Sequence, residues 1–193
     1  MLFRSSGTLT LSGNNTYTGA TTVSAGTLAV TANNALGTNA AGTTVASGAT
    51  LDLQNVTYST TEALTVNGGT IKTSTGTSAV AGAITLGANS TFDVGGTQLT
   101  ASGNITDGAN TFGITKTSSG KLILSNSTNS YDGATTISAG TLEVSGQLNS
   151  GSYASNISNA GSLTYSSSSD QTLSGIISGV GTVTKSEIGR AHV

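Results

Sequence analysis

The sequence predicts an all-β protein coiled as a parallel β-helix, a β-solenoid with about 21 residues per turn and roughly nine turns. Three observations predict it: a long phrase that occurs twice, an apolar–polar–apolar triplet that recurs at a near-constant interval, and a composition rich in Gly and Thr. Internal repetition of this kind is typical of proteins whose turns stack on one another instead of closing into a globule.

The repeated phrase runs from Gly7 to Val30 and returns from Gly120 to Val144, with one extra residue before the tyrosine of the second copy. Both copies contain Tyr-x-Gly-Ala-Thr-Thr, beginning at Tyr17 and Tyr131, and both close on Ser-Ala-Gly-Thr-Leu-x-Val. The start of a third copy lies near Val183, because Val-Thr-Lys-Ser there resembles the Ile-Thr-Lys-Thr that precedes the second copy. In a protein built from a repeat of this length, we expect function to depend on the extended surface of the stack and not on a pocket.

The triplets predict the strands. Alternation over so few residues indicates a half-buried strand, and Gly, Asn and Ser turns separate one triplet from the next. No segment has sustained helical periodicity. Successive triplets start 19 to 23 residues apart, except for one interval of 30 residues. Their first residues are Leu9, Leu28, Leu51, Ile71, Phe92, Leu122, Leu142, Leu163 and Val183.

Each triplet is expected to lie at the same phase of the coil, which would give a rod roughly 40 Å long. The first residues of the triplets from Leu9 to Leu163 are then expected to form a single inward column. The third residues would lie deeper on the same wall, at Leu11, Val30, Leu53, Val94, Leu124 and Val144. The middle residues should face water, and those with charge are Asp52, Lys72, Asp93 and Glu143, with Ile123 as the exception.

Composition excludes several classes of function. Charged residues make up only 7 %, the net charge is −2 and the pI is about 5.0, so the chain has no basic surface for nucleic acid. It has no cysteine, which excludes disulfides and thiol chemistry, and no apolar run of about 18 residues that would insert into a membrane as a helix.

The two ends look foreign to the repeat. Codons can be chosen for Glu187–Val193 whose reverse complement encodes Val-Leu-Phe-Arg-Ser, so one DNA stretch read on opposite strands accounts for both ends, and it resembles a sequencing adapter. We therefore expect residues 1–5 and 187–193 to be adapter-derived, and residues 6–186 to be a single β-helix segment. The sole histidine, His192, falls in the excluded tail.

The phrase Gly-Thr-Leu-Thr-Leu-Ser-Gly-Asn-Asn-Thr-Tyr-Thr-Gly-Ala-Thr-Thr-Val-Ser-Ala-Gly-Thr-Leu, which starts at Gly7, resembles the autotransporter-associated β-strand repeat of type V secretion passenger domains. The resemblance covers nearly all of residues 7–186. It implies a right-handed β-helix, secretion through a C-terminal outer-membrane β-barrel, and display on the Gram-negative cell surface. That family's repeat is linked to transport of the passenger, and it carries no catalytic residues to transfer.

The sequence offers few candidate catalytic or metal-binding residues. Asp52 and Asp93 would lie two turns apart, about 9.6 Å, at the upper edge of the separation of an inverting glycosidase pair. Lys72 lies between them, however, and an exposed Asp-Lys-Asp ladder explains the spacing more simply. Without cysteine or a credible histidine, neither a metal site nor a nucleophilic triad has its usual residues. We therefore predict no catalytic, cofactor-binding or metal-binding residues and no cofactor.

Tyrosine and asparagine are assigned structural roles. Tyr17 and Tyr131 are expected to cover turns instead of binding sugar. The six matches to the glycosylation sequon are expected to be turn residues or stacked asparagines, and they begin at Asn14, Asn55, Asn89, Asn104, Asn126 and Asn156.

The expected function is a non-enzymatic structural or adhesive β-helical passenger fragment whose repeats aid folding and export. Its expected partners are its own C-terminal outer-membrane β-barrel and possible host-surface or matrix glycans and proteins, with no nucleic acid and no membrane insertion by this segment. Two alternatives remain open: a polysaccharide-acting β-helix enzyme, either a lyase or a glycosidase, and a secreted solenoid adhesin without a barrel.

Overall fold

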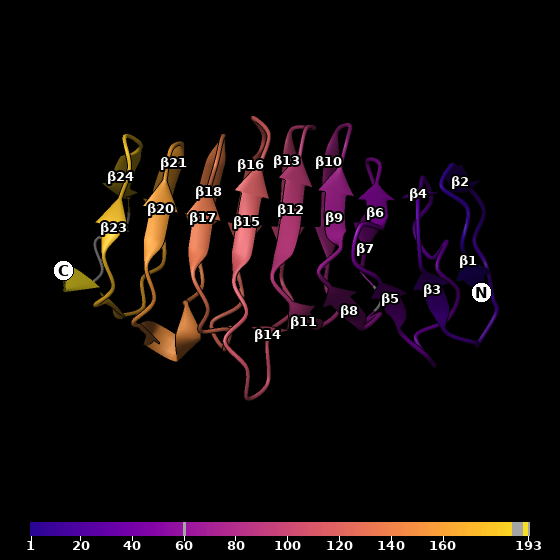
Figure 1. Ribbon diagram of the computed structural model, residues 1–193, viewed down its shortest axis with the longest axis horizontal. Helices are drawn as coiled ribbons and strands as arrows, with labels where there is room; N and C mark the ends of the chain where they lie inside the picture. The colour runs from indigo at the N-terminus through magenta and orange to yellow at the C-terminus, as the bar shows by residue number, and fades with distance from the viewer. Residues whose placement is uncertain (60, 187–190, 193) are drawn as a thin grey trace.

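Parallel strands stack side by side along one rod, with the two ends of the chain at opposite ends of it (Figure 1). The computed structural model describes residues 1–59, 61–186 and 191–192. The strands within this range form four sheets, and one 3-10 turn, Asn149–Gly151, is the only helical element within it. No helix of the described residues is suited to crossing a bilayer. The all-β solenoid of about nine turns predicted from the sequence is confirmed.

Two sheets run through most of the rod. The nine-stranded sheet contains, in spatial order, β2 (Thr8–Leu11), β4 (Thr27–Val30), β6 (Thr50–Leu53), β9 (Thr70–Thr73), β12 (Ser90–Val94), β15 (Ile114–Thr117), β17 (Thr135–Ile137), β20 (Ile157–Asn159) and β23 (Ile177–Ser178). The seven-stranded sheet contains β7 (Thr57–Tyr58), β10 (Thr77–Val80), β13 (Gln98–Ala101), β16 (Lys121–Leu124), β18 (Thr141–Val144), β21 (Ser162–Tyr165) and β24 (Thr182–Lys185).

The third side of the rod is divided between two sheets. The six-stranded sheet contains β1 (Leu2–Phe3), β3 (Thr21–Val23), β5 (Thr43–Val45), β8 (Leu64–Asn67), β11 (Ile84–Ala88) and β14 (Ile105–Thr106). The three-stranded sheet contains β19 (Ser152–Tyr153), β22 (Gln171–Leu173) and β25 (Ala191–His192). A turn such as β8, β9 and β10 visits the three sides in order, and β20, β21 and β22 do the same nearer the C-terminus.

Alternation places the apolar residues inside. In the nine-stranded sheet Leu28, Leu51, Ile71 and Phe92 are in register and have no solvent exposure. Thr27 and its partner Thr50, one residue earlier in each strand, point outward and are half-buried. Threonine and other β-branched residues suit this pleated, half-buried surface, so the short triplets suffice to define the strands.

The single inward column predicted from the triplets is wrong. Phe92 is in register with Lys116 of β15, which is in register with Ile137. Leu122 and Leu142 lie in the seven-stranded sheet instead, in register with Leu99. The third residues of the triplets divide in the same way, since Leu124 and Val144 also lie in the seven-stranded sheet. The interval of 30 residues between Phe92 and Leu122 contains an additional strand, β15, which moves the later triplets to the next side of the rod.

The outward column also departs from expectation at Asp52. Its register partners are Ala29 and Lys72, as expected, but the aspartate is only 5 % exposed instead of facing water. Neighbouring polar side chains cover its carboxylate. Ile123, the apolar exception, lies half-buried in the outward column of the seven-stranded sheet, in register with Thr100 and Glu143.

One glycine of the repeated phrase has a clear steric reason. Gly140, in the closing Ser-Ala-Gly-Thr, has a φ of 69°, and a Cβ there would lie 2.5 Å from the carbonyl oxygens of Gly120 and Ser118 in the preceding turn. Gly26, the equivalent residue of the first copy, has a φ of 67° and a similar close approach to Ser5 and Gly7. The phrase therefore keeps glycine where two turns of backbone touch at a left-handed corner.

Candidate functional site

The ladder that offered the best enzymatic interpretation is an ion pair. Lys72 Nζ lies 2.9 Å from Asp93 Oδ2, and their side chains are 35 % and 20 % exposed. Burial on its own would raise the pKa of Asp93, but hydrogen bonds from Ser118 and Lys72 lower it overall, so the carboxyl stays ionised. Asp93 also accepts a hydrogen bond of 3.2 Å from the Thr117 hydroxyl. The carboxylate of Asp93 is therefore occupied by side chains of neighbouring turns.

Asp52, the other half of the supposed pair, is equally engaged. Its Oδ1 accepts a hydrogen bond from the backbone N–H of Ser74 at 2.9 Å, and its Oδ2 accepts hydrogen bonds from the Ser74 hydroxyl at 2.7 Å and from Gln54 Nε2 at 2.8 Å. A general base must reach a water or substrate proton, and a carboxylate covered by three donors does not. The structure thus brings Asp52, Lys72 and Asp93 together in one column but builds no acid–base pair from them.

A second carboxyl, Glu62, lies inside the rod, where sequence reasoning gave it no role. It is 3 % exposed, its Oε1 accepts a hydrogen bond of 2.8 Å from the Thr43 hydroxyl, and its Oε2 has no partner. Burial raises the pKa of Glu62, which favours the protonated acid.

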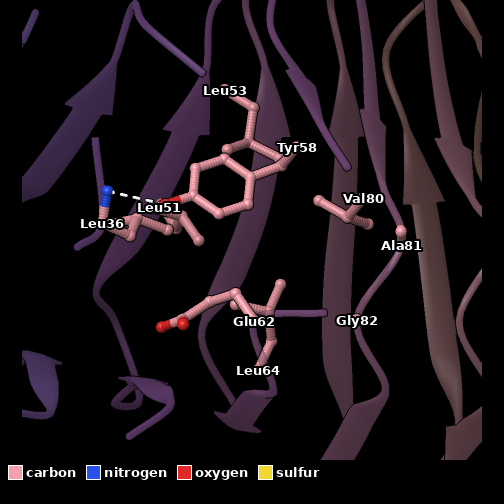
Figure 2. A pocket seen from close by; sticks show the side chains of 9 residues that line it. All are labelled: Leu36, Leu51, Leu53, Tyr58, Glu62, Leu64, Val80, Ala81 and Gly82. Atoms are coloured by element: carbon pink, nitrogen blue, oxygen red, sulfur yellow. Dashed lines mark hydrogen bonds between the residues drawn. The ribbon is translucent and has the colours of Figure 1, made fainter. Parts of the chain in front are cut away.

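Figure 2 shows the small cavity beside Glu62, where the ring of Tyr58 lies beside Leu53 and points toward Leu36, and its hydroxyl accepts a hydrogen bond of 2.8 Å from the Leu36 N–H. The cavity measures about 10 Å³ and has a mostly aliphatic lining. That volume holds about one water molecule. The cavity is therefore too small to hold a substrate beside Glu62.

A larger, open cleft lies on the surface of the N-terminal half. Its volume is about 520 Å³, within the usual range for ligand sites. All its side chains are uncharged amides or hydroxyls, and the Asn39 amide donates a hydrogen bond of 3.2 Å to Thr61 across it. A cleft with this lining could hold a neutral polar molecule, but it has no acid, base or nucleophile–base pair. The lining residues are Asn15, Asn34, Gly37, Thr38, Asn39, Ser59 and Thr61.

The tyrosines of the phrase cover turns. The hydroxyl of Tyr131 shares a hydrogen bond of 3.1 Å with that of Thr135, and Tyr17 and Thr21 form the same contact at 2.7 Å. Tyr131 is fully buried and packs edge-on against Tyr153 with 5.8 Å between ring centroids. Burial raises the pKa of Tyr131 well above its usual value. A ring with no exposed surface cannot stack on a sugar, so Tyr131 belongs to the core.

Asparagines of the sequon matches join one turn to the next. Asn89 Oδ1 accepts a hydrogen bond of 2.7 Å from the Gly113 N–H, and Asn156 Oδ1 accepts one of 2.9 Å from the Ile176 N–H. Asn126 Oδ1 caps its own turn through Thr128, and its Nδ2 donates to the Ser102 carbonyl at 3.0 Å. These contacts are those expected of turn residues and inter-turn bridges.

Sequence reasoning missed the most unusual side chain, Lys116. It has no solvent exposure, and its Nζ donates three hydrogen bonds to carbonyl oxygens: 2.6 Å to Thr117, 2.7 Å to Ser118 and 3.2 Å to Ala139. Burial lowers the pKa of Lys116 to about 8, opposed by the charge of Asp93. The sequence did contain an indication of its burial. Lys116 lies two residues after Ile114, and in an alternating strand two such residues point to the same, inward side.

The described residues hold no further candidate site for metal or acid–base chemistry. No group of three or more His, Cys, Asp or Glu side chains in that part of the chain could hold a metal ion. The second ion pair found there, Lys121 Nζ to Glu143 Oε2 at 2.8 Å, again joins neighbouring strands. The titratable groups described above therefore connect turns of the rod.

The family comparison falls on the repeated phrase. The model of the passenger-associated-transport-repeat matches residues 5–30 and 114–144. No curated protein and no solved structure matches the chain. The first match covers β2 to β4 and the second covers β15 to β18. The chain therefore carries two copies of the passenger-associated-transport-repeat, the repeat of autotransporter passenger regions.

Proposed function

We propose that the chain is part of a surface-displayed autotransporter passenger, that it serves as a rigid, non-enzymatic stalk, and that its repeats help the passenger fold as it is exported. The observation that carries this proposal is the position of both repeats within one uninterrupted stack of parallel turns. A barrel that follows the passenger in the outer membrane is the partner that this function requires. We expect residues 1–5 and 187–193 to be foreign to that passenger; residues 187–190 and 193 lie outside the described residues.

The physics of the stack supports this role. Each strand pairs only with the turns before and after it, so folding can propagate from one end without waiting for distant contacts. The chain has no cysteine and no proline, so neither disulfide formation nor prolyl isomerisation slows it. A chain that emerges unfolded can therefore coil as it appears, and each completed turn resists backward movement.

The test is an export assay in which residues 6–186 are placed between a signal peptide and an outer-membrane β-barrel. Removing residues 114–134 deletes one turn from the second repeat and leaves the stack in register, because Ile114 and Thr135 are register partners. We expect this deletion to slow the appearance of the passenger at the cell surface, measured by protease accessibility over time.

The matched control removes residues 43–63, a segment of the same length outside both repeats. It also preserves register, since Thr43 pairs with Leu64. We expect the control to be exported at nearly the parental rate. Equal export of the two deletions, whether fast or slow, would mean that the repeats have no special part in transport.

Adhesion is the second component of the proposal. The uncharged cleft lined by amides and hydroxyls suits the neutral hydroxyl groups of a host-surface or matrix glycan. Cells that display the passenger are expected to bind such glycans, and a display-competent passenger without binding would leave only the stalk. The polysaccharide-acting enzyme gains no support, because the carboxylates of Asp52 and Asp93 are both occupied by neighbouring donors.

A further inference from the structure

The two copies of the repeat lie on different sides of the rod. In the first copy the Thr-Thr strand β3 belongs to the six-stranded sheet, and the Gly-Thr-Leu strand β4 belongs to the nine-stranded sheet. In the second copy the equivalent strands, β17 and β18, belong to the nine-stranded and seven-stranded sheets. The same sequence is therefore displaced by one side between copies.

The displacement arises at β15. In each preceding turn a strand of the six-stranded sheet leads directly into a Gly-Thr-Leu type of strand in the nine-stranded sheet, as β11 leads into β12. After β14 the place in the nine-stranded sheet is taken by β15, which pairs with β12 in full register. The strand that contains Leu122, β16, therefore lies in the seven-stranded sheet, where it pairs with β13. One extra strand thus accounts for the whole displacement.

Lys116 makes this extra strand compatible with the core. Its stem occupies the inward column between Phe92 and Ile137. Its ammonium group bonds two carbonyls of the corner that follows β15, and Ser118 at that corner has a φ of 63°. The third bond, to the Ala139 carbonyl, reaches the next turn. All three ammonium protons are therefore used to join a left-handed corner to its neighbour.

A second strand of the same type occurs at β24. Lys185 is in register with Tyr165 as Lys116 is with Phe92, so it has the inward phase of its strand, but Lys185 is exposed whereas Lys116 is buried. Lys185 Nζ lies 5.3 Å from the centre of the Tyr165 ring and bonds the Ser167 carbonyl at 2.8 Å. In the first copy the equivalent place falls on β1, within the residues expected to be adapter-derived, and Phe3 stands where the lysine would be, so this copy contributes no lysine strand.

We propose that the lysine strand that opens a repeat, as β15 does for the second copy, is a side-advancing element, and that each repeat opened by such a strand rotates the pattern of the following sequence by one of the three sides of the rod. The strands β15 and β24 lie on successive sides, those of the nine-stranded and seven-stranded sheets, as this rule requires. Lys116 is the positioning residue of the element, because its ammonium group fixes the corner at which the chain changes side.

Paired cysteines in this cysteine-free chain can test the rule, since directly paired residues on neighbouring strands come within reach of a disulfide. In the parent chain, Thr100→Cys with Ile123→Cys is expected to cross-link, and Asp93→Cys with Ile123→Cys is not. In a variant that lacks residues 108–117 and carries Asp107→Val, the junction reproduces the layout of residues 21–28. There the preference is expected to reverse, and persistence of the Thr100–Ile123 cross-link would overturn the proposal.

An extension keeps the test decisive if that deletion fails to fold. Residues 187–193 are replaced by a copy of residues 118–144, so that β24 serves as its lysine strand. We expect a cysteine at the Ile123 position of the added copy to cross-link with Thr172→Cys, on the side of β22. Cross-linking with Thr164→Cys in β21 would show that β24 had been displaced and that no advance takes place.

Lys116 itself is tested in the Thr100→Cys, Ile123→Cys background. Lys116→Met keeps the length of the side chain and removes the three donors, and it is expected to lower the yield of this cross-link. Lys116→Arg retains a cation and is expected to recover part of the yield. Unchanged cross-linking in Lys116→Met, together with the expected results for the deletion, would assign the advance to the strand alone and remove Lys116 from the proposal.

Discussion

Phe92→Ala is expected to destabilise the protein by about 3–5 kcal/mol, the usual cost of emptying a fully buried aromatic site. Phe92 has no exposed surface and lies in the inward column between Ile71 and Lys116. Its neighbours are held by backbone hydrogen bonds on both sides, so they cannot collapse into the space. The loss should be measured by urea unfolding followed by circular dichroism, as a change in the midpoint at constant slope.

The control for this substitution is Phe112→Ala. Phe112 is the same residue type, but it lies half-buried in the loop before β15 and packs only against the edge of the core. We expect its replacement to cost about 1 kcal/mol. Similar losses for the two variants would contradict the assignment of Phe92 to the column that carries the stack through the change of side.

The free energy of unfolding is expected to rise between pH 8 and pH 10 and to fall above pH 10. Burial lowers the pKa of Lys116 to about 8 from an unfolded value near 10.5, so over this range the unfolded chain binds more protons and the folded state gains. The gain is about 2 kcal/mol. Above pH 10 the unfolded tyrosines ionise, but burial raises the pKa of Tyr153 to about 12 and raises that of Tyr131 well above its usual value, so the folded state loses stability.

Two variants separate the two limbs of this profile. Lys116→Met should abolish the rise and leave the fall, whereas Tyr153→Phe should reduce the fall and leave the rise. The slope with pH is diagnostic here, because Lys116→Met also deprives three carbonyls of donors and changes the absolute stability. Urea unfolding at half-unit steps of pH measures it. A rise that persists in Lys116→Met would mean that the lysine keeps its proton through this range.

The sequence was sufficient for the fold class because each strand carries its own local signal. Leu51 alternates with polar residues, and both Leu28 and Leu51 follow a Gly-Thr or Ala-Thr corner, so their inward direction and turn length were correctly predicted. The assignment of Leu122 to the same column failed for a physical reason. Alternation tells which residues point inward, but it does not tell on which of three sides a strand lies, and that depends on counting every strand before it.

The buried polar groups show a second limit. Asp52 was expected in water because it occupies an outward position, but covering depends on Gln54 and on Ser74 from the next turn. Lys116 was overlooked because a lysine is rarely buried, although its strand alternates in the inward phase. In both cases one deciding partner lies a turn away, Ser74 for Asp52 and Ala139 for Lys116, at a separation along the chain that local patterns do not include.

The displacement between the repeats has a consequence for how such genes can grow. Unequal crossing-over between the two copies duplicates the segment from β2 to β16, and β15 is the fifth strand beyond β2 in the nine-stranded sheet. Each duplication therefore adds five full turns and one further side. Each added block therefore also rotates the surface pattern of the passenger by one side about the axis of the rod. Three such blocks must be added before a given epitope faces its original direction again.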